Sequence, residues 1–262
     1  MMAFPMVITS RAIVFAAFCL FFWAEQEVRA DESGPVQSWK FAADKVVDDV
    51  IQPVVGELRG EILGAFEMGD DEGLPFLRLR PSPEGKREAG AGGIILSRDP
   101  VEAKVVAGAM TAEAWVKLDS TLEWGGIIGA VRDTGAEEDG WILGYRNDRF
   151  YFGLAAENPG KITYLNASSP FVLGAWYHVV ATYDGKELQK IYVDGRLAGH
   201  SRTQRGPVPR PDPFFYMLGS YRDDDNDFPM SGCLAEVSVW HRELSAEEIA
   251  RRLIAGRKSF RG

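Results

Sequence analysis

The sequence predicts an all-β protein, an antiparallel two-sheet β-sandwich with one short carboxyl-terminal helix. Residues 176–183 (WYHVVATY) alternate with a period of two, which is typical of a strand with two distinct faces. Asp184-Gly185 then supplies a tight turn, residues 188–193 return, and Asp194-Gly195 supplies a second turn, because both dipeptides tolerate positive φ. These residues form a β-meander, which is architecture without catalytic chemistry.

Further strands are expected at short and regular spacing before this meander. They are predicted at residues 124–131, 141–145, 150–154 and 162–165, with turn residues between them. Such spacing favours an antiparallel sandwich over alternating strands and helices. Opening strands are expected at 38–41 and 76–79, and residues 81–93, rich in proline and glycine, are expected to form a loop.

The carboxyl-terminal helix is predicted from its capping residues. Ser245 followed by Glu248 forms a capping box, in which each side chain bonds the backbone of the other residue. Gly256 stands where a carboxyl-terminal cap would fall. Residues 257–262 are therefore expected to be a frayed tail.

Four segments carry a family resemblance: residues 110–118 (MTAEAWVKL), the meander, residues 215–220 (FYMLGS) and residues 231–253. In this order they resemble the laminin-G-like jelly roll domains of the concanavalin A-like lectin/glucanase superfamily. The resemblance implies a single jelly roll domain over residues 31–256. It does not define one function, since this fold occurs in enzymes, lectins and adhesion modules.

Residues 1–30 are expected to be a secretory signal peptide. Arg11 precedes an uncharged apolar run over 12–24, and residues 28–30 offer a cleavage site after Ala30. The run is shorter than the about 20 residues that cross a bilayer. The mature protein is predicted to be secreted, periplasmic or extracellular, without membrane insertion. The alternative is an uncleaved amino-terminal membrane anchor.

The net charge limits the classes of expected partner, and the cysteine content limits the expected disulfides. The formal net charge is −9, and removal of the predicted signal takes away two basic and two acidic residues, which leaves this value unchanged. Nucleic acid and anionic membranes are bound by clustered lysine and arginine, so neither is an expected partner. Cys19 leaves with the signal and Cys233 remains alone, so no intrachain disulfide is expected.

The strand at residues 234–241 (LAEVSVWH) corresponds to the one on which related β-glucanases carry their carboxylates, in a pattern resembling E-x-D-x-x-E. A retaining glycosidase needs an acid and a nucleophile about 5 to 5.5 Å apart. Here Glu236 is followed by Ser238 and Trp240, so one carboxylate would have to serve both roles. No catalytic residue is predicted and the protein is not expected to be an enzyme. A glycan hydrolase or lyase that uses Glu236 is the alternative.

A non-catalytic binding module for carbohydrate, or for a glycosylated or protein partner outside the cytoplasm, is the function that the sequence favours. Sugars are bound by aromatic faces and a few polar groups, and the candidate ligand-binding residues are Trp240, Glu236, Trp141 and Tyr145. Unbroken alternation along 233–240 would place Trp240 and Glu236 on one face, opposite the apolar residues. A module that only packs against protein is a further alternative, which predicts an exposed apolar patch.

Residues 223–227 (DDDND) concentrate carboxylates in one loop between two strands. Asp223, Asp225 and Asp227 are the candidate ligands for calcium, which takes six to eight oxygen ligands. The family resemblance also implies calcium as a candidate cofactor. However, the loop lacks the glycine and glutamate of an EF-hand, and Ala235 stands where the family's D-E-V motif has its aspartate. A solvated acidic loop is the alternative.

Overall fold

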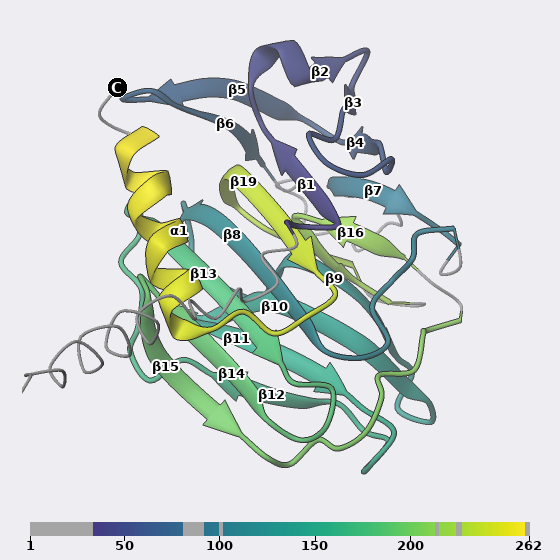
Figure 1. Ribbon diagram of the computed structural model, residues 1–262. Helices are drawn as coiled ribbons and strands as arrows, with labels where there is room; N and C mark the ends of the chain where they lie inside the picture. Colours follow the sequence, from purple (N-terminus) through teal and green to yellow (C-terminus); the bar gives the residue numbers. More distant parts are fainter. Residues whose placement is uncertain (1–33, 81–91, 100–101, 213–214, 224–226, 260–262) are drawn as a thin grey trace, which may run out of the picture. The chain divides into compact units, whose positions relative to one another are not determined.

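The computed structural model (Figure 1) describes residues 34–80, 92–99, 102–212, 215–223 and 227–259. The chain divides into two units, Met1–Gly34 and Pro35–Gly262. Only Gly34 of the first unit is among the described residues, so the predicted signal peptide lies outside them. Most of the predicted loop 81–93 lies outside them as well.

The second unit is a sandwich of two antiparallel sheets, which confirms the predicted fold (Figure 1). Sheet A consists of β1 (Gln37–Lys40), β5 (Phe66–Asp71), β6 (Leu74–Leu79), β8 (Met110–Leu118), β13 (Trp176–Tyr183), β14 (Gln189–Val193), β15 (Arg196–Ser201) and β19 (Gly232–Trp240). Its strand order is β15-β14-β13-β8-β19-β6-β5, and β1 pairs with β19.

Sheet B consists of β2 (Val46–Val47), β3 (Val50–Ile51), β4 (Gly60–Leu63), β7 (Gly93–Ser97), β9 (Leu122–Asp133), β10 (Glu138–Asn147), β11 (Arg149–Ala155), β12 (Thr163–Asn166) and β16 (Tyr216–Leu218). Its order is β12-β11-β10-β9-β16-β7-β4-β3-β2. The remaining elements are the hairpin strands β17 (Ser220–Arg222) and β18 (Asp227–Pro229), a short 3-10 helix, η1 (Ala43–Lys45), and α1 (Ala246–Ser259). Each strand predicted between 124 and 165 is present.

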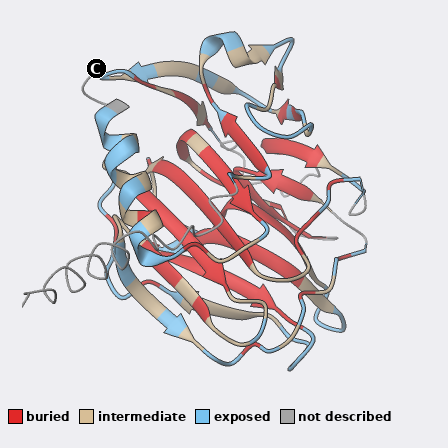
Figure 2. Ribbon diagram, in the orientation of Figure 1, coloured by how far each residue is buried: buried red, intermediate tan, exposed pale blue. Residues whose placement is uncertain are grey.

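The main core lies between the two sheets, and Figure 2 shows burial along their central strands. Alternate residues of β8, such as Ala114 and Val116, face this core from sheet A. Trp141 and Tyr145 of β10 face it from sheet B, and the Trp141 ring meets Tyr216 edge-on at 6.1 Å between centroids. Residues from both sheets thus share one close-packed core.

The predicted meander is confirmed as β13, β14 and β15. The Asp184 carboxylate accepts the backbone N–H groups of the next turn, those of Lys186, Glu187 and Leu188, at 2.8, 2.8 and 2.9 Å. The second turn contains only Asp194 and Gly195, with φ of 49° and 72°. Two successive residues with positive φ are the signature of the tightest hairpin turns.

The predicted alternation holds from Glu236 to Trp240, where Val237 and Val239 face the main core, but a β-bulge breaks it before Glu236. Leu234 pairs with Val116 and Glu236 pairs with Trp115, so Ala235 is an extra residue in the strand. Cys233 and Ala235 consequently pack with Trp115 on the outer face of sheet A, away from the main core. The bulge lies where β19 changes its second partner from β6 to β1.

Helix α1 covers the outer face of sheet A (Figure 1). Val180 of β13 and Trp240 of β19 pack with Leu244 and Ile249. Trp115 of β8 packs near Leu253. Both faces of the central strands of sheet A are therefore buried.

The capping box of α1 is confirmed. The Glu248 N–H donates to Ser245 Oγ at 3.2 Å, and the Ser245 N–H donates to Glu248 Oε2 at 2.8 Å. The predicted end at Gly256 is wrong, since α1 continues to Ser259 and takes in the first three residues of the expected tail. A Cβ at Gly256 would lie 2.6 Å from atoms of the Trp115 ring, so the glycine allows close helix-to-sheet contact.

We expect Ser245→Ala to lower the free energy of unfolding by roughly 0.5–2 kcal/mol, because an amide of the first helical turn loses its acceptor. Thermal melts of the two proteins measure the loss. Ser245→Thr, which keeps the hydroxyl, is the control and should retain most of the stability. Equal melting temperatures for Ser245→Ala and the parent would show that the cap contributes nothing.

Candidate functional site

Three of the four predicted ligand-binding residues are buried, which contradicts that role. Trp141 and Tyr145 lie in the main core, where the Tyr145 hydroxyl accepts the N–H of Ser231 at 3.1 Å. Trp240 is only 2% exposed because α1 covers its strand face. Sequence patterns identify aromatic residues on strands but do not reveal which element covers them.

Glu236 retains some exposure, 24% of its side chain, and belongs to an ion-pair network beneath the end of α1. Its carboxylate lies 3.5 Å from Lys40 Nζ and 3.7 Å from a terminal nitrogen of Arg252. A small cavity of about 240 Å³ is found here. The network also contains Glu113, which sequence analysis missed.

Glu113 is a buried carboxylate on the outer face of β8. Arg252 Nε donates to its Oε2 at 2.5 Å, and its Oε1 is hydrogen-bonded to Nε2 of the buried His178. Burial raises the pKa of Glu113, but the His178 hydrogen bond and the Arg252 charge outweigh this effect and hold the pKa below its ordinary value. The one sequence signal for it is a glutamate between two alanines in the segment 110–118, which carries the family resemblance.

This geometry is unsuited to glycoside hydrolysis by Glu113 and Glu236. A general acid needs a raised pKa, whereas that of Glu113 is lowered and both of its oxygens are already bonded. The Arg252 guanidinium also lies 4.4 Å from the centroid of the Trp240 ring, so it binds α1 to sheet A through charge and stacking. The arrangement holds the helix in place.

We expect Arg252→Met to destabilise the fold by about 3 kcal/mol, the lower end of the cost of breaking a buried ion pair, because Arg252 is partly exposed. Chemical denaturation at neutral pH measures this loss. Arg251→Met, at an exposed position of the same helix, is the matched control and should change stability by less than about 1 kcal/mol.

The same pair predicts a pH dependence. Because the folded-state pKa of Glu113 lies below its ordinary value of 4.5, its contribution to stability is present above that value and lost as pH falls through the folded pKa. The deficit of Arg252→Met should therefore shrink between about pH 5 and about pH 3, as protonation removes the buried charge. A deficit that is constant over this range would contradict the assignment.

The acidic loop is described only at its ends. Asp223 and Asp227 are buried, which differs from a fully solvated loop, and Asp227 Oδ1 accepts the Ser220 hydroxyl at 2.5 Å. Asp225 lies outside the described residues. Within the described part of the chain, no three histidine, cysteine, aspartate or glutamate side chains gather as a metal site would require. Calcium binding stays a prediction.

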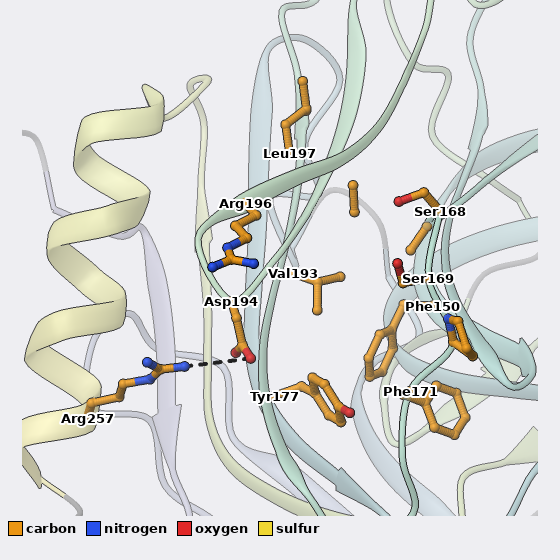
Figure 3. A pocket seen from close by; sticks show the side chains of 13 residues that line it. Phe150, Ser168, Ser169, Phe171, Tyr177, Val193, Asp194, Arg196, Leu197 and Arg257 are labelled. Atoms are coloured by element: carbon orange, nitrogen blue, oxygen red, sulfur yellow. Dashed lines mark ion pairs between the residues drawn. The ribbon is translucent and has the colours of Figure 1, made fainter.

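A larger cavity, which we call the edge pocket, lies beside the edge strands β12 and β15 (Figure 3). Its volume is about 510 Å³. It is lined by Phe150, Ala167, Ser168, Ser169, Pro170, Phe171, Tyr177, Val193, Asp194, Arg196, Leu197, Ala198 and Arg257. None of these residues was among the predicted site residues.

One wall of the edge pocket is the loop that follows β12. The Ala167 N–H donates to the Phe150 carbonyl at 2.8 Å, and the Ser168 N–H donates to the Ala198 carbonyl at 2.9 Å, which joins the two sheets at this edge. Arg149 donates to the carbonyls of Ala167 and Ser168 at 3.2 and 2.6 Å. The backbone of this wall is therefore held by hydrogen bonds, and its serine side chains are exposed.

The inner lining of the edge pocket is aromatic. The Phe150 ring lies 5.0 Å from that of Phe171 and 5.5 Å from that of Tyr177. The Tyr177 hydroxyl accepts the Val172 N–H at 2.8 Å, so the ring is fixed against the loop. Phe150 and Phe171 are only 1% and 7% exposed, so the half-buried Tyr177 is the ring of this lining that a ligand can reach. A cavity of this size with apolar surface and a few polar groups is the general design of a small-ligand site.

The opposite wall is the two-residue turn between β14 and β15. The Asp194 carboxylate accepts the His178 N–H at 3.1 Å through Oδ1, and its Oδ2 lies 3.6 Å from Arg257 of α1. Figure 3 shows Arg196 beside this pair, across the cavity from Ser168 and Ser169. The turn was predicted correctly, but its adjacency to the loop after β12 has no local sequence signal.

Residues 90–250 match the model of the laminin G family described as the concanavalin A-like lectin/glucanases superfamily. The match spans more than half of the 262 residues, and the chain belongs to this family. The predicted resemblance is confirmed.

Part of the chain is also similar in sequence to Pappalysin-1. The mouse protein is 27% identical over 111 residues and the human protein 25% identical over 111 residues. Each match covers 38% of this chain and 7% of the relative, so the chain corresponds to a small part of their length.

Two kinds of solved structure share the fold. The binding domain of botulinum neurotoxin serotype G superposes with a TM-score of 0.60 at 13% identity, covering 85% of this chain and 51% of that chain. Trypanosoma rangeli sialidase in complex with the inhibitor DANA superposes with a TM-score of 0.59 at 18% identity. The match covers 87% of this chain and 34% of the sialidase chain. At these identities the likeness is one of fold.

None of the helices among the described residues has the length and apolar character needed to cross a membrane.

Proposed function

We propose that the protein is a secreted, non-catalytic module that binds carbohydrate in the edge pocket, either free or on a glycosylated protein. The observation that carries this proposal is the composition of the pocket, which combines the half-buried ring of Tyr177, exposed serines and a charged rim. The apolar face of a sugar ring packs on aromatic carbon while its hydroxyls bond polar side chains. Sharing a fold with a toxin binding domain supports the binding role.

The carboxylates of the pocket support binding over catalysis. Asp194 is the only acidic side chain among the residues that line the edge pocket. Its two oxygens are engaged by the His178 N–H and by Arg257. Glycoside hydrolysis by paired carboxylates needs two such groups across one bond, so the pocket has the parts for recognition alone.

Exposed apolar residues beside the pocket favour a glycosylated protein as the partner. Val172, which follows the wall residue Phe171, is 65% exposed, and Leu197 on the opposite wall is also exposed. Covering these apolar side chains with the surface of a partner protein would stabilise the complex, while the sugar of that partner occupies the edge pocket between them.

We expect Ser169→Trp to weaken glycan binding at least tenfold, because the indole fills the pocket from an exposed position that the fold tolerates. Glycan arrays and pull-downs from extracellular polysaccharide and cell-wall fractions identify ligands for the parent protein. Isothermal calorimetry then compares the variants. Thr121→Trp, an exposed position that does not line the pocket, is the matched control and should bind like the parent.

Equal binding by Ser169→Trp and the parent would place the ligand elsewhere.

The enzyme alternative is tested by incubating the mature protein with polysaccharides and measuring new reducing ends or unsaturated products. Turnover that Glu236→Gln abolishes without loss of folding would overturn the non-catalytic role. Protein capture without any sugar affinity would favour the purely protein-binding alternative.

Calcium bound by Asp223, Asp225 and Asp227 is a second part of the proposal, supported by the concentration of carboxylates in the loop. Binding to the native state alone stabilises it by about 2.7 kcal/mol when free calcium is a hundredfold above its Kd. Calorimetric melts should rise in submillimolar calcium and not in equal magnesium, whose smaller shell requires a stricter octahedron. The triple alanine variant should lose the shift, and an equal shift in variant and parent would contradict the site.

A further inference from the structure

We infer that the edge pocket selects glycans that carry one anionic group, a carboxylate or a sulfate, and that Arg196 binds this group. The inference rests on the proposed function, because it specifies which carbohydrate the same pocket takes. It rests on two observations. The rim has more guanidinium groups than carboxylates, and hydrogen bonds to β13 fix the turn that carries Arg196.

The rim of the edge pocket has two guanidinium groups and one carboxylate. Asp194 lies between Arg196 and Arg257 in Figure 3, and its ion pair is with Arg257 at 3.6 Å. Arg196 is exposed, and its side chain has no hydrogen bond or ion pair with any other described residue. One positive charge at the rim is therefore left for a ligand.

The backbone that carries Arg196 is fixed. The Asp194 N–H donates to the His178 carbonyl at 2.8 Å, and the His178 N–H returns a bond to the Asp194 side chain at 3.1 Å. Arg196 pairs with Val193 directly across the two-residue turn. Because the turn is held by bonds to β13, a ligand that binds Arg196 loses little entropy in ordering the backbone.

The ligand chemistry follows from the guanidinium. Arginine presents a planar set of donors that matches a carboxylate or a sulfate with two parallel hydrogen bonds. The chain as a whole carries a net charge of −9, which repels a polyanion approaching other parts of the surface. A single anionic group on an otherwise neutral glycan therefore fits this rim better than a chain of charged sugars.

Matched pairs of sugars test the inference. The probes are a uronic acid disaccharide and its methyl ester, sialyllactose and lactose, and a monosulfated disaccharide and its unsulfated parent, each titrated by calorimetry. In at least one pair the charged member should bind about tenfold more tightly, and this preference should decline as salt is raised. The pair that responds distinguishes carboxylate from sulfate.

Arg196→Gln should remove the preference, so that the charged and neutral members of the responding pair bind with equal affinity. Arg59→Gln, an exposed arginine that does not line the pocket, makes the same change in net charge and should keep the preference. Melting temperatures confirm that both variants are folded.

Three outcomes would count against the inference. Equal affinity for charged and neutral members in the parent protein overturns it and leaves the proposed function standing. A charge preference that survives Arg196→Gln shows that Arg196 is not the anion-binding residue. No binding of any sugar overturns both the inference and the proposed function.

Discussion

The packing of α1 against the outer face of sheet A determines which side chains of this protein meet solvent. Without the helix, one face of β8, β13 and β19 would be open to solvent. The side chains of Trp240, Trp115 and Glu113, which are buried on this face, would then be exposed. Burial of large apolar rings on this face supplies the stabilisation, at about 25 cal/mol for each Å² removed from water. That face is therefore part of the interior of this protein.

Glu113 shows how that interior accommodates a charge. A buried carboxylate alone is costly, but this one is bonded to His178 on the next strand and to Arg252 on the helix. The helix therefore brings both the apolar cover and the counter-charge. Since Arg252 also contacts the ring of Trp240, loss of helix contact would expose an apolar surface and isolate a charge at the same time.

The same helix contributes to the edge pocket. Gly195 in the turn between β14 and β15 lies against α1, where a Cβ would be 3.0 Å from Leu253. The following turn of the helix carries Arg257 to Asp194. The packing on one face of sheet A and one wall of the edge pocket thus depend on one element, and the glycine that makes the turn possible also lets the helix approach.

Local patterns in the sequence determined the strands of the meander, the two turn dipeptides and the capping box, because each depends on residues only a few positions apart. Only the tertiary structure decided the rest. Alternation shows that β19 has two faces, but the bulge at Ala235 arises where the strand changes partners. Gly256 has the residue type of a cap, yet Trp115 from β8 makes it an interior contact. The edge pocket joins a loop after β12 to a turn after β14, and such distant contacts are decided by packing of the whole chain.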